Sequence, residues 1–433
     1  MKEIVRIITL GCKVNQFESE SFRAGFEDAG FLVADKEAAD IVVINTCGVT
    51  GAAGAQSRQT IRKALRSAPD ARIVITGCYA ELMDGSMEAE LAKRDCLFVG
   101  NAKKDLLVET VLAGRTPGKL MGDISKAETI CNLPVRRFGK RSRAYLRVQD
   151  GCESYCSYCI VPFTRGPSRS QVPEEAIHQA RVFSDEGHRE IVITGIHLGY
   201  YGRDLSPNTN LIELIDRLSL ATPQTLYRIS SLEPTEITTE LLQLMDERDN
   251  IQPHLHIPLQ SGCDTILQKM NRHYTTEQFR QTVLMCREML PDCGIGIDIL
   301  AGFPGETEAQ FQEALHFLET LPFSYLHVFP YSPRPGTKAA SFSNQVPGEI
   351  RRERARQLRA LSMKKQQDFN RSQIGRTLSL LVEGKRDERG MLRGVTGNYV
   401  TVHFPGPDSL LGDCVFVRLL KMENTTVIGE REE

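Results

Sequence analysis

An alternation of short apolar segments with amphipathic segments restricts the fold of this 433-residue chain more than any other feature of its sequence. Within the first 115 residues, four apolar runs are each followed by a segment with helical spacing. The apolar runs occupy residues 4–12, 40–47, 71–78 and 96–100, and the helical segments occupy residues 19–30, 57–68, 86–95 and 103–114. Near-continuous apolar runs are typical of parallel strands covered by helices on both sides. Residues 1–115 therefore predict an α/β domain with a doubly wound parallel sheet.

Three of these apolar runs end in a cysteine, namely Cys12, Cys47 and Cys78. In open parallel sheets, ligands bind in the crevice beyond the carboxyl ends of the strands. The fold would therefore gather three thiols that are distant in the sequence at one edge of the sheet. Three small buried cysteines are the alternative. We disfavour it because all three residues occupy the same strand-end position and two of them follow glycine.

A second stretch of βα alternation begins at residue 143. It follows a segment, residues 116–142, whose Gly, Pro and basic residues and weak periodicity indicate a linker. Six apolar runs separated by helical segments predict a partial or full (β/α) barrel, with its site at the carboxyl ends of the strands. A long basic helix is expected at about 347–370, so the predicted central domain spans residues 143–370.

The tail, residues 371–433, shows short β patterns separated by Gly, Asn and Pro, and no helical period. A segment of this size fits a small β-barrel of the kind that binds oligonucleotides. A purely structural cap is an equally good interpretation. Strand alternation places Tyr399 and His403 on one face and Phe404 on the other, so some of these rings must be core. We therefore nominate no single tail residue as an RNA ligand.

Composition excludes several classes of protein. The formal net charge is −2, so any contact with nucleic acid must come from local basic surface. For two basic stretches, residues 135–147 and 351–365, a solvated linker or helix face is the better interpretation. The sequence has no run of about 18 apolar residues and no signal-peptide pattern, so we expect a cytoplasmic protein without a membrane partner. Twelve cysteines in such a protein indicate metal or redox use.

Cys152, Cys156 and Cys159 follow the first strand of the predicted barrel with the spacing C-x3-C-x2-C. Structural zinc sites need four ligands, commonly from two separated CxxC pairs, and no second pair occurs here. A 4Fe-4S cluster fits better because cysteine thiolates hold such clusters. With three thiolates, one iron keeps an open position for a substrate or cofactor.

This loop, placed after the first strand of a (β/α) barrel, resembles that of the radical S-adenosylmethionine (SAM) family. The resemblance implies that SAM binds the open iron and is cleaved to a 5′-deoxyadenosyl radical. Tyr158, directly before Cys159, also matches the family. By the same resemblance, we expect SAM contacts at the ends of successive strands, from Gly195, Glu233, Gln260, Phe303 and Gly305 in addition to Tyr158.

The order of the segments resembles the methylthiotransferases over essentially the whole chain. The resemblance implies that Cys12, Cys47 and Cys78 hold a first 4Fe-4S cluster, that Cys152, Cys156 and Cys159 hold a second, and that the tail is a TRAM-like RNA-binding domain. It also implies two uses of SAM, one to methylate sulfur and one to generate the radical. Catalytic residues beyond the cluster ligands are not predicted.

The first loop distinguishes the branches of this family. Lys13, Val14 and Asn15 resemble the branch that methylthiolates carbon 2 of N6-threonylcarbamoyladenosine at position 37 of tRNA. Methylthiolation of isopentenyladenosine or of a ribosomal-protein aspartate is the alternative, and an RNA-binding iron–sulfur electron carrier or redox sensor is a second. The expected partners are tRNA and an electron donor such as flavodoxin or ferredoxin. His254 and His256 share a strand face, but we prefer hydrogen-bonded histidines to a metal pair there.

Overall fold

The structure is a computed structural model that describes residues 3–35, 39–83, 87, 91, 94–114, 118–139 and 142–432. Most of the helix predicted at residues 86–95 lies outside the described residues. No helix in the described ranges is both long and apolar enough to cross a membrane.

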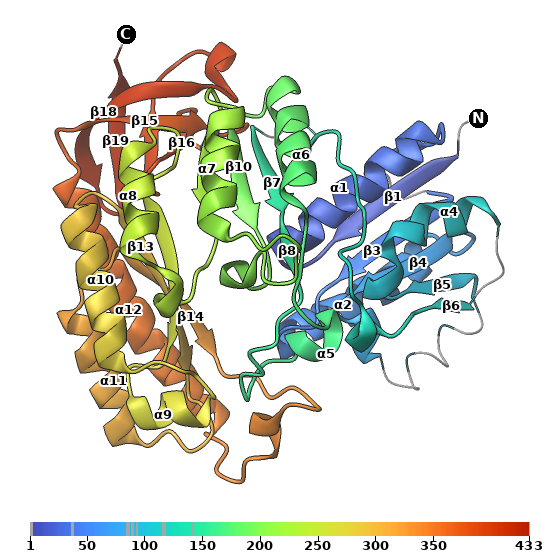
Figure 1. Ribbon diagram of the computed structural model, residues 1–433, viewed down its shortest axis with the longest axis horizontal. Coiled ribbons are helices and arrows are strands. Elements are labelled where there is room, and N and C mark those ends of the chain that lie inside the picture. The colour runs from blue at the N-terminus through green and yellow to red at the C-terminus, as the bar shows by residue number, and fades with distance from the viewer. Residues whose placement is uncertain are drawn as a thin grey trace.

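The N-terminal part is a parallel sheet with helices on both faces (Figure 1). Its strand order is β2-β1-β3-β4-β5-β6. The bounds are β1 Ile4–Thr9, β2 Leu32–Val33, β3 Ile41–Thr46, β4 Arg72–Gly77, β5 Cys96–Val99 and β6 Gly118–Leu120. Helices α1 (Lys13–Asp28) and α4 (Leu107–Leu112) share one core with the sheet, and α2 (Gly51–Ser67) builds the core on the other face. The predicted doubly wound sheet is confirmed, and part of the predicted linker forms its edge strand β6.

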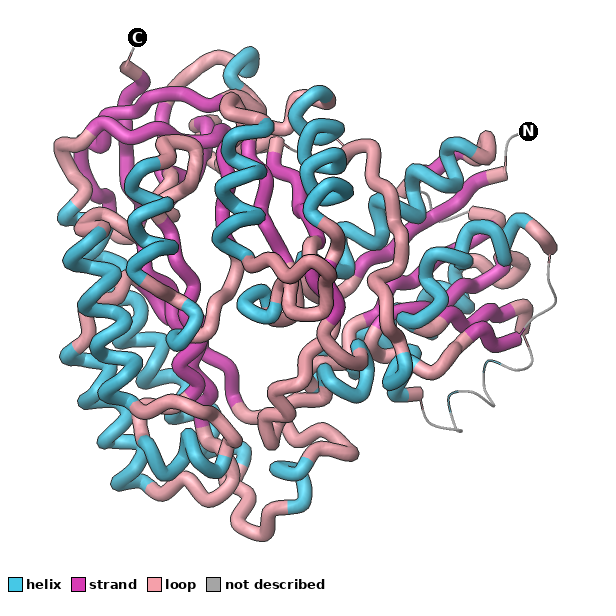
Figure 2. The backbone as a smooth tube through the Cα atoms, viewed as in Figure 1, coloured by secondary structure: helices cyan, strands magenta, loops and turns pink. Residues whose placement is uncertain are grey.

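The central part is an open barrel of six parallel strands in two groups, β11-β10-β7 and β12-β13-β14. An isolated bridge between Ser231 and His256 connects the groups. The strands are β7 Arg143–Arg147, β10 Glu190–Thr194, β11 Leu226–Ile229, β12 His254–Gln260, β13 Gly294–Ala301 and β14 Tyr325–Pro330. Figure 2 shows helices covering the outer side of these strands. The fold is therefore the partial (β/α) barrel that the sequence predicts.

The helices of the central part begin where short polar side chains cap their first turns. Thr238, Thr275 and Thr307 each accept a hydrogen bond from a backbone amide three residues ahead, and such caps stabilise helix starts. The helices are α5 Val161–Arg165, α6 Pro173–Asp185, α7 Leu211–Ala221, α8 Thr239–Glu247, α9 Asp264–Lys269, α10 Thr276–Met289, α11 Glu308–Thr320 and α12 Gly348–Ser372. A short hairpin, β8 Gln149–Asp150 with β9 Arg169–Ser170, brackets the cysteine loop and α5.

The tail forms a closed barrel with the order β15-β16-β17-β19-β18. The strands are β15 Thr377–Val382, β16 Leu392–Thr396, β17 Thr401–Phe404, β18 Cys414–Glu423 and β19 Thr426–Arg431. Phe404 is fully buried in its core. This barrel covers the end of the central barrel at which the strands begin, opposite the end near α5 (Figure 1). Arg228 joins the two barrels by donating hydrogen bonds to the carbonyls of Thr396 and Gly397.

The N-terminal domain packs beside the central barrel along its edge strand β7. Helix α1 lies against β7, and the amide of Gly51 donates a 2.8 Å hydrogen bond to Ser332, which follows β14. The N-terminal domain therefore contacts both edges of the open barrel.

Candidate functional site

The three strand-end cysteines of the N-terminal sheet lie together. Strands β1, β3 and β4 are parallel neighbours, so the residues that follow them meet at one edge of the sheet. A Cβ atom built on Gly11 would lie 2.7 Å from the Cβ of Cys47, which means that the chain beside Cys12 contacts Cys47 directly. Cys78 follows β4 next to them. The structure thus brings together the cysteines that the sequence nominates, the N-terminal trio Cys12, Cys47 and Cys78.

Glycine is required at two of these strand ends. Gly11 and Gly77 have φ values of +95° and +93°, a conformation that residues with a side chain rarely adopt. A Cβ on Gly77 would lie 2.3 Å from the carbonyl oxygen of Thr46. That carbonyl accepts a 3.1 Å hydrogen bond from the Cys78 amide. These close approaches hold the cysteines at fixed positions relative to one another.

The three thiols of the N-terminal trio differ in exposure. Cys12 is exposed, whereas Cys47 and Cys78 are buried. Burial nevertheless raises the pKa of the Cys12 thiol, and it raises the pKa of Cys47 to about 11. The guanidinium group of Arg165 opposes this increase in the pKa of Cys12, so Cys12 lies near the boundary between the two domains.

The second trio, Cys152, Cys156 and Cys159, lies on the loop between β8 and α5. Asn271 fixes this loop because its side-chain amide donates to the carbonyls of Ser154 and Tyr155 at 3.1 and 3.2 Å. Burial, reinforced by Cys156, raises the pKa of Cys159 to about 12. The three thiols are close enough to influence one another electrostatically, as ligands of one metal cluster would be.

Polar side chains from neighbouring loops contact the sulfurs of the second trio. The Sγ of Cys152 lies 3.5 Å from Nδ1 of His197, whose Nε2 lies 2.6 Å from a Glu236 carboxylate oxygen. Burial opposes ionisation of Cys152, but hydrogen bonds from His197 and Ser154 lower the pKa of its thiol. Arg272 donates to the Sγ of Cys156 at 3.3 Å. Such contacts favour the thiolate form, which is the form that binds metal.

A buried arginine connects the N-terminal trio with the domain that carries the second trio. Arg165, on α5, follows Cys159 by six residues and is fully buried. Its Nε donates to the Sγ of Cys78 at 3.4 Å, and its terminal nitrogens lie 2.7 Å from Glu18 and 3.1 Å from Asp150. Glu18 belongs to α1 and Asp150 directly precedes the second cysteine loop. One guanidinium therefore bridges the N-terminal domain and the central barrel.

The Arg165 network carries an excess of positive charge. It contains two carboxylates and four cations, which are Glu18, Asp150, Lys104, Arg147, Arg165 and Arg169. Burial alone would raise the pKa of Glu18, but Arg165, Lys104 and Arg147 hold it well below its usual range. The excess cations also favour anionic thiolates nearby. Three thiols beside such a network fit an iron–sulfur cluster held by cysteine thiolates.

The predicted SAM contacts that would act through their side chains fall into two groups, one at a cavity beside the cysteines and one in a buried apolar cluster. Glu233 lines a cavity of about 230 Å³ together with Cys156 and His197, and it pairs with Arg272. Tyr158 instead packs against a buried apolar cluster that contains Phe303. The fully buried Phe303 ring contacts Tyr331 and Phe342.

The remaining predicted contacts are backbone positions at strand ends. Gly195 lies against Gln149, since a Cβ on it would be 2.9 Å from the Gln149 side-chain oxygen. Gln260 ends β12 with φ +69°, and Gly305 has φ +80°. Close backbone approach at these ends suits a ligand that runs across several strands.

Sequence reasoning missed Gln149, Arg165 and Arg272. The Gln149 oxygen accepts from the amides of Ile196 and His197, and its nitrogen donates to Gly151. Gln149 thereby connects the loop that follows β10 to the cysteine loop. None of the three belongs to a spacing motif. Gln149 and Arg165 lie three and six residues from a nominated cysteine, whereas Arg272 lies 12 residues beyond Gln260, the nearest nominated residue.

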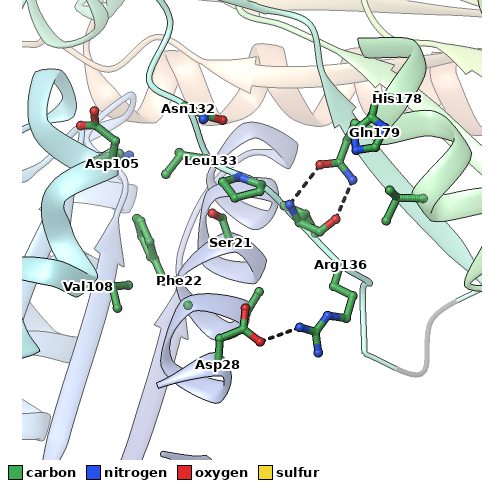
Figure 3. A pocket seen from close by; sticks show the side chains of 16 residues that line it. Ser21, Phe22, Asp28, Asp105, Val108, Asn132, Leu133, Arg136, His178 and Gln179 are labelled. Atoms are coloured by element: carbon green, nitrogen blue, oxygen red, sulfur yellow. Dashed lines mark hydrogen bonds and ion pairs between the residues drawn. The ribbon is translucent and has the colours of Figure 1, made fainter. Parts of the chain in front are cut away.

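Two other features lie apart from the cysteines. A cavity of about 420 Å³ lies between α1, α4, residues 132–136 and α6. At this cavity, the side-chain amide of Gln179 forms two hydrogen bonds with the backbone of Val135 (Figure 3). The cavity contains no predicted site residue and receives the segment that joins the domains. In the central barrel, His256, Asp298 and His327 could hold a metal, since their ligand atoms lie within 4.8 Å of one another.

Family models and curated relatives match this chain over most of its length. Residues 4–99 match the model of "Uncharacterized protein family UPF0004", and residues 146–318 match that of the radical SAM superfamily. The chain is 39% identical to threonylcarbamoyladenosine tRNA methylthiotransferase MtaB of Bacillus subtilis (strain 168), covering 95% of this chain and 93% of that protein. It is 32% identical to the tRNA-2-methylthio-N(6)-dimethylallyladenosine synthase of Moorella thermoacetica, covering 99% and 98%.

Among solved structures, the radical SAM methyltransferase TsrM from Kitasatospora setae matches with a TM-score of 0.57 and 17% identity. The match covers 78% of this chain and 77% of that one, and it supports the fold. The two curated relatives align over nearly the full length of the chain. The chain therefore belongs to the radical SAM family of tRNA methylthiotransferases.

Proposed function

We propose that this enzyme transfers a methylthio group to carbon 2 of N6-threonylcarbamoyladenosine at position 37 of tRNA. The observation that carries the proposal is the pair of cysteine trios, which lie on two domains that Arg165 bridges. An unactivated C–H bond has no useful acidity, so its functionalisation requires cofactor radical chemistry rather than a protein base. Two metal-binding trios on adjoining domains allow radical generation and sulfur supply to be divided between two centres.

Cys12, Cys47 and Cys78 hold one 4Fe-4S cluster in this proposal, and Cys152, Cys156 and Cys159 hold the other. When bound, these groups and SAM supply a carbon-centred radical and the sulfur that reaches the substrate. Tyr158, Gly195, Glu233, Gln260, Phe303 and Gly305 form the SAM site, Phe303 by supporting Tyr158. His197 and Arg272 orient the cysteine loop and donate hydrogen bonds to its sulfurs.

Lys13 supports the threonylcarbamoyl branch. It directly follows Cys12 and is exposed, yet burial and the guanidinium groups of Arg228 and Arg143 lower its pKa to about 8. Its side chain therefore extends toward Arg228 and Arg143 of the central barrel. No described carboxylate lies within ion-pairing distance of its ammonium group. A threonylcarbamoyl group carries a carboxylate that can pair with this cation, whereas an isopentenyl group carries no charge.

The proposed division of labour follows the chain. Residues 1–115 present sulfur, residues 116–142 link the domains, residues 143–370 generate the radical, and residues 371–433 form a TRAM-like domain that binds tRNA. An electron donor such as flavodoxin or ferredoxin reduces the enzyme in the cytoplasm.

Reconstituted enzyme, SAM and a reductant should be incubated with tRNA that carries either threonylcarbamoyladenosine or isopentenyladenosine, followed by mass spectrometry of the nucleosides. Methylthiolation of the first nucleoside only is expected. Modification of the second would favour the alternative substrate. Absence of 5′-deoxyadenosine would instead favour an electron carrier or redox sensor.

A further inference from the structure

Tyr399 occupies an unusual position at the junction of the two barrels. It lies in the turn between β16 and β17 with φ +72°, a conformation that is rare for a bulky residue. The turn is fixed because Thr396 accepts hydrogen bonds from the amides of Tyr399 and Val400 at 3.0 and 2.9 Å. A residue held in a sparsely populated conformation by its surroundings often serves a function.

The ring of Tyr399 stacks on aromatic groups of the central barrel. Its centroid lies 4.5 Å from that of His254 and 5.6 Å from that of Tyr325, with interplanar angles of 26° and 25°. His254 and Tyr325 are hydrogen-bonded to each other at 2.7 Å and form a nearly flat support. The guanidinium carbon of Arg228 lies 5.2 Å from the Tyr399 centroid.

Tyr399 nevertheless remains 42% exposed. A ring that served only to pack the two barrels together would be buried between them. An accessible aromatic surface beside a guanidinium group is the arrangement on which single-stranded nucleic acid bases stack. The phenol hydroxyl plays no part in such stacking, so phenylalanine should replace Tyr399 without loss.

The position of Tyr399 determines which ligand can reach it. His254 is the first residue of β12, and the predicted SAM contact Gln260 is the last, about 20 Å away at 3.3 Å per residue. A SAM molecule held at the cysteine loop therefore does not supply the stacking partner. The adenine ring undergoing modification must also lie near that loop, while its threonylcarbamoyl group extends toward Lys13. A neighbouring base of the same RNA loop can span the distance.

We propose that Tyr399, supported by His254 and Tyr325, binds by stacking a base that neighbours the modified adenosine in the anticodon loop. This proposal rests on the proposed tRNA substrate. It makes the C-terminal barrel a part of the substrate site, since this barrel places a side chain against the interior of the central barrel.

Binding of an anticodon stem-loop RNA to the reconstituted enzyme, followed by fluorescence anisotropy, tests the proposal. Loss of base stacking weakens binding by roughly 5- to 150-fold. Tyr399→Ala should show this loss and Tyr399→Phe should not. Phe416→Ala is the matched control, because Phe416 is 62% exposed on the same barrel and makes no ring contact with a described residue.

A second measurement identifies the base. Each loop nucleotide in turn is replaced by an abasic one, and binding is measured with the wild type and with Tyr399→Ala. One abasic position should weaken the wild type but leave Tyr399→Ala unaffected. Equal losses in both proteins at every position would overturn the proposal. Tyr399→Leu serves if the alanine variant does not fold.

Product analysis separates this proposal from the proposed function. If one abasic position weakens binding to the wild type but not to Tyr399→Ala, while the wild type forms no methylthio nucleoside, the proposed function fails and the stacking proposal is supported. If the product forms and no position couples to Tyr399, only the stacking proposal fails.

Discussion

Replacing Arg165 with methionine should loosen the contact between the N-terminal domain and the central barrel. Arg165 is fully buried and contacts Glu18, Asp150 and Cys78. Methionine keeps much of the side-chain volume but leaves two buried carboxylates short of a partner. Removing one member of a buried ion pair costs about 3–5 kcal/mol. Lys104 and Arg147 remain beside Glu18, so we expect about 3 kcal/mol, the lower end of that range.

The cost should depend on pH. In the wild type, neighbouring cations hold the pKa values of Glu18 and Asp150 below their usual range. Carboxylates with depressed pKa values contribute stability that is fully present above their unfolded pKa of about 4 and is lost as the pH falls through the folded values. Removal of Arg165 raises both pKa values toward the unfolded ones. The variant should therefore lose most at pH 7 and progressively less as the pH falls below about 4.

Hydrogen exchange of amides in α1 and α5 measures the free energy of this local opening. Arg136→Met is the matched control, because Arg136 of the joining segment pairs with Asp28 of α1 but both side chains are exposed. It should cost less than about 1 kcal/mol. A loss below about 1 kcal/mol for Arg165→Met at pH 7, or one that does not change with pH, would refute the reasoning.

Three further results are expected. Cys156→Ala should abolish formation of 5′-deoxyadenosine, whereas Cys47→Ala should retain it but form no methylthio nucleoside; equal loss of both would contradict the division of labour. Lys13→Gln should lower kcat/KM for threonylcarbamoyladenosine tRNA by about 10- to 150-fold, the worth of a charged hydrogen bond, and unchanged kinetics would remove Lys13 from the substrate site. In the cluster-free chain at pH 7, iodoacetamide should modify Cys152 faster than Cys47 or Cys156. The reason is that the pKa of Cys152 is lowered, whereas burial raises the pKa values of Cys47 and Cys156. His197→Phe should slow the modification of Cys152.

The N-terminal trio could be predicted because it depends on local pattern. Apolar runs that end in cysteine identify Cys12, Cys47 and Cys78 as strand-end residues, and parallel neighbouring strands then bring them together. No side-chain contact is needed for that inference. The C-x3-C-x2-C loop is local for the same reason.

Contacts between distant segments could not be predicted in this way. Arg165 is 147 residues from Glu18 in the sequence, and no periodic pattern connects them. Phe303 was nominated from its place at a strand end, yet its ring is fully buried, because which way a side chain turns there depends on packing. Tyr399 was placed in strand alternation, but it lies in a turn before β17 and contacts the other barrel.

The number of iron and sulfide ions bound by anaerobically purified protein tests the central claim most directly. Two clusters require about eight of each per chain. Replacing all three cysteines of either trio with alanine should leave about four of each. About four of each in the wild type, or about eight in the variant lacking Cys12, Cys47 and Cys78, would contradict the two-cluster account.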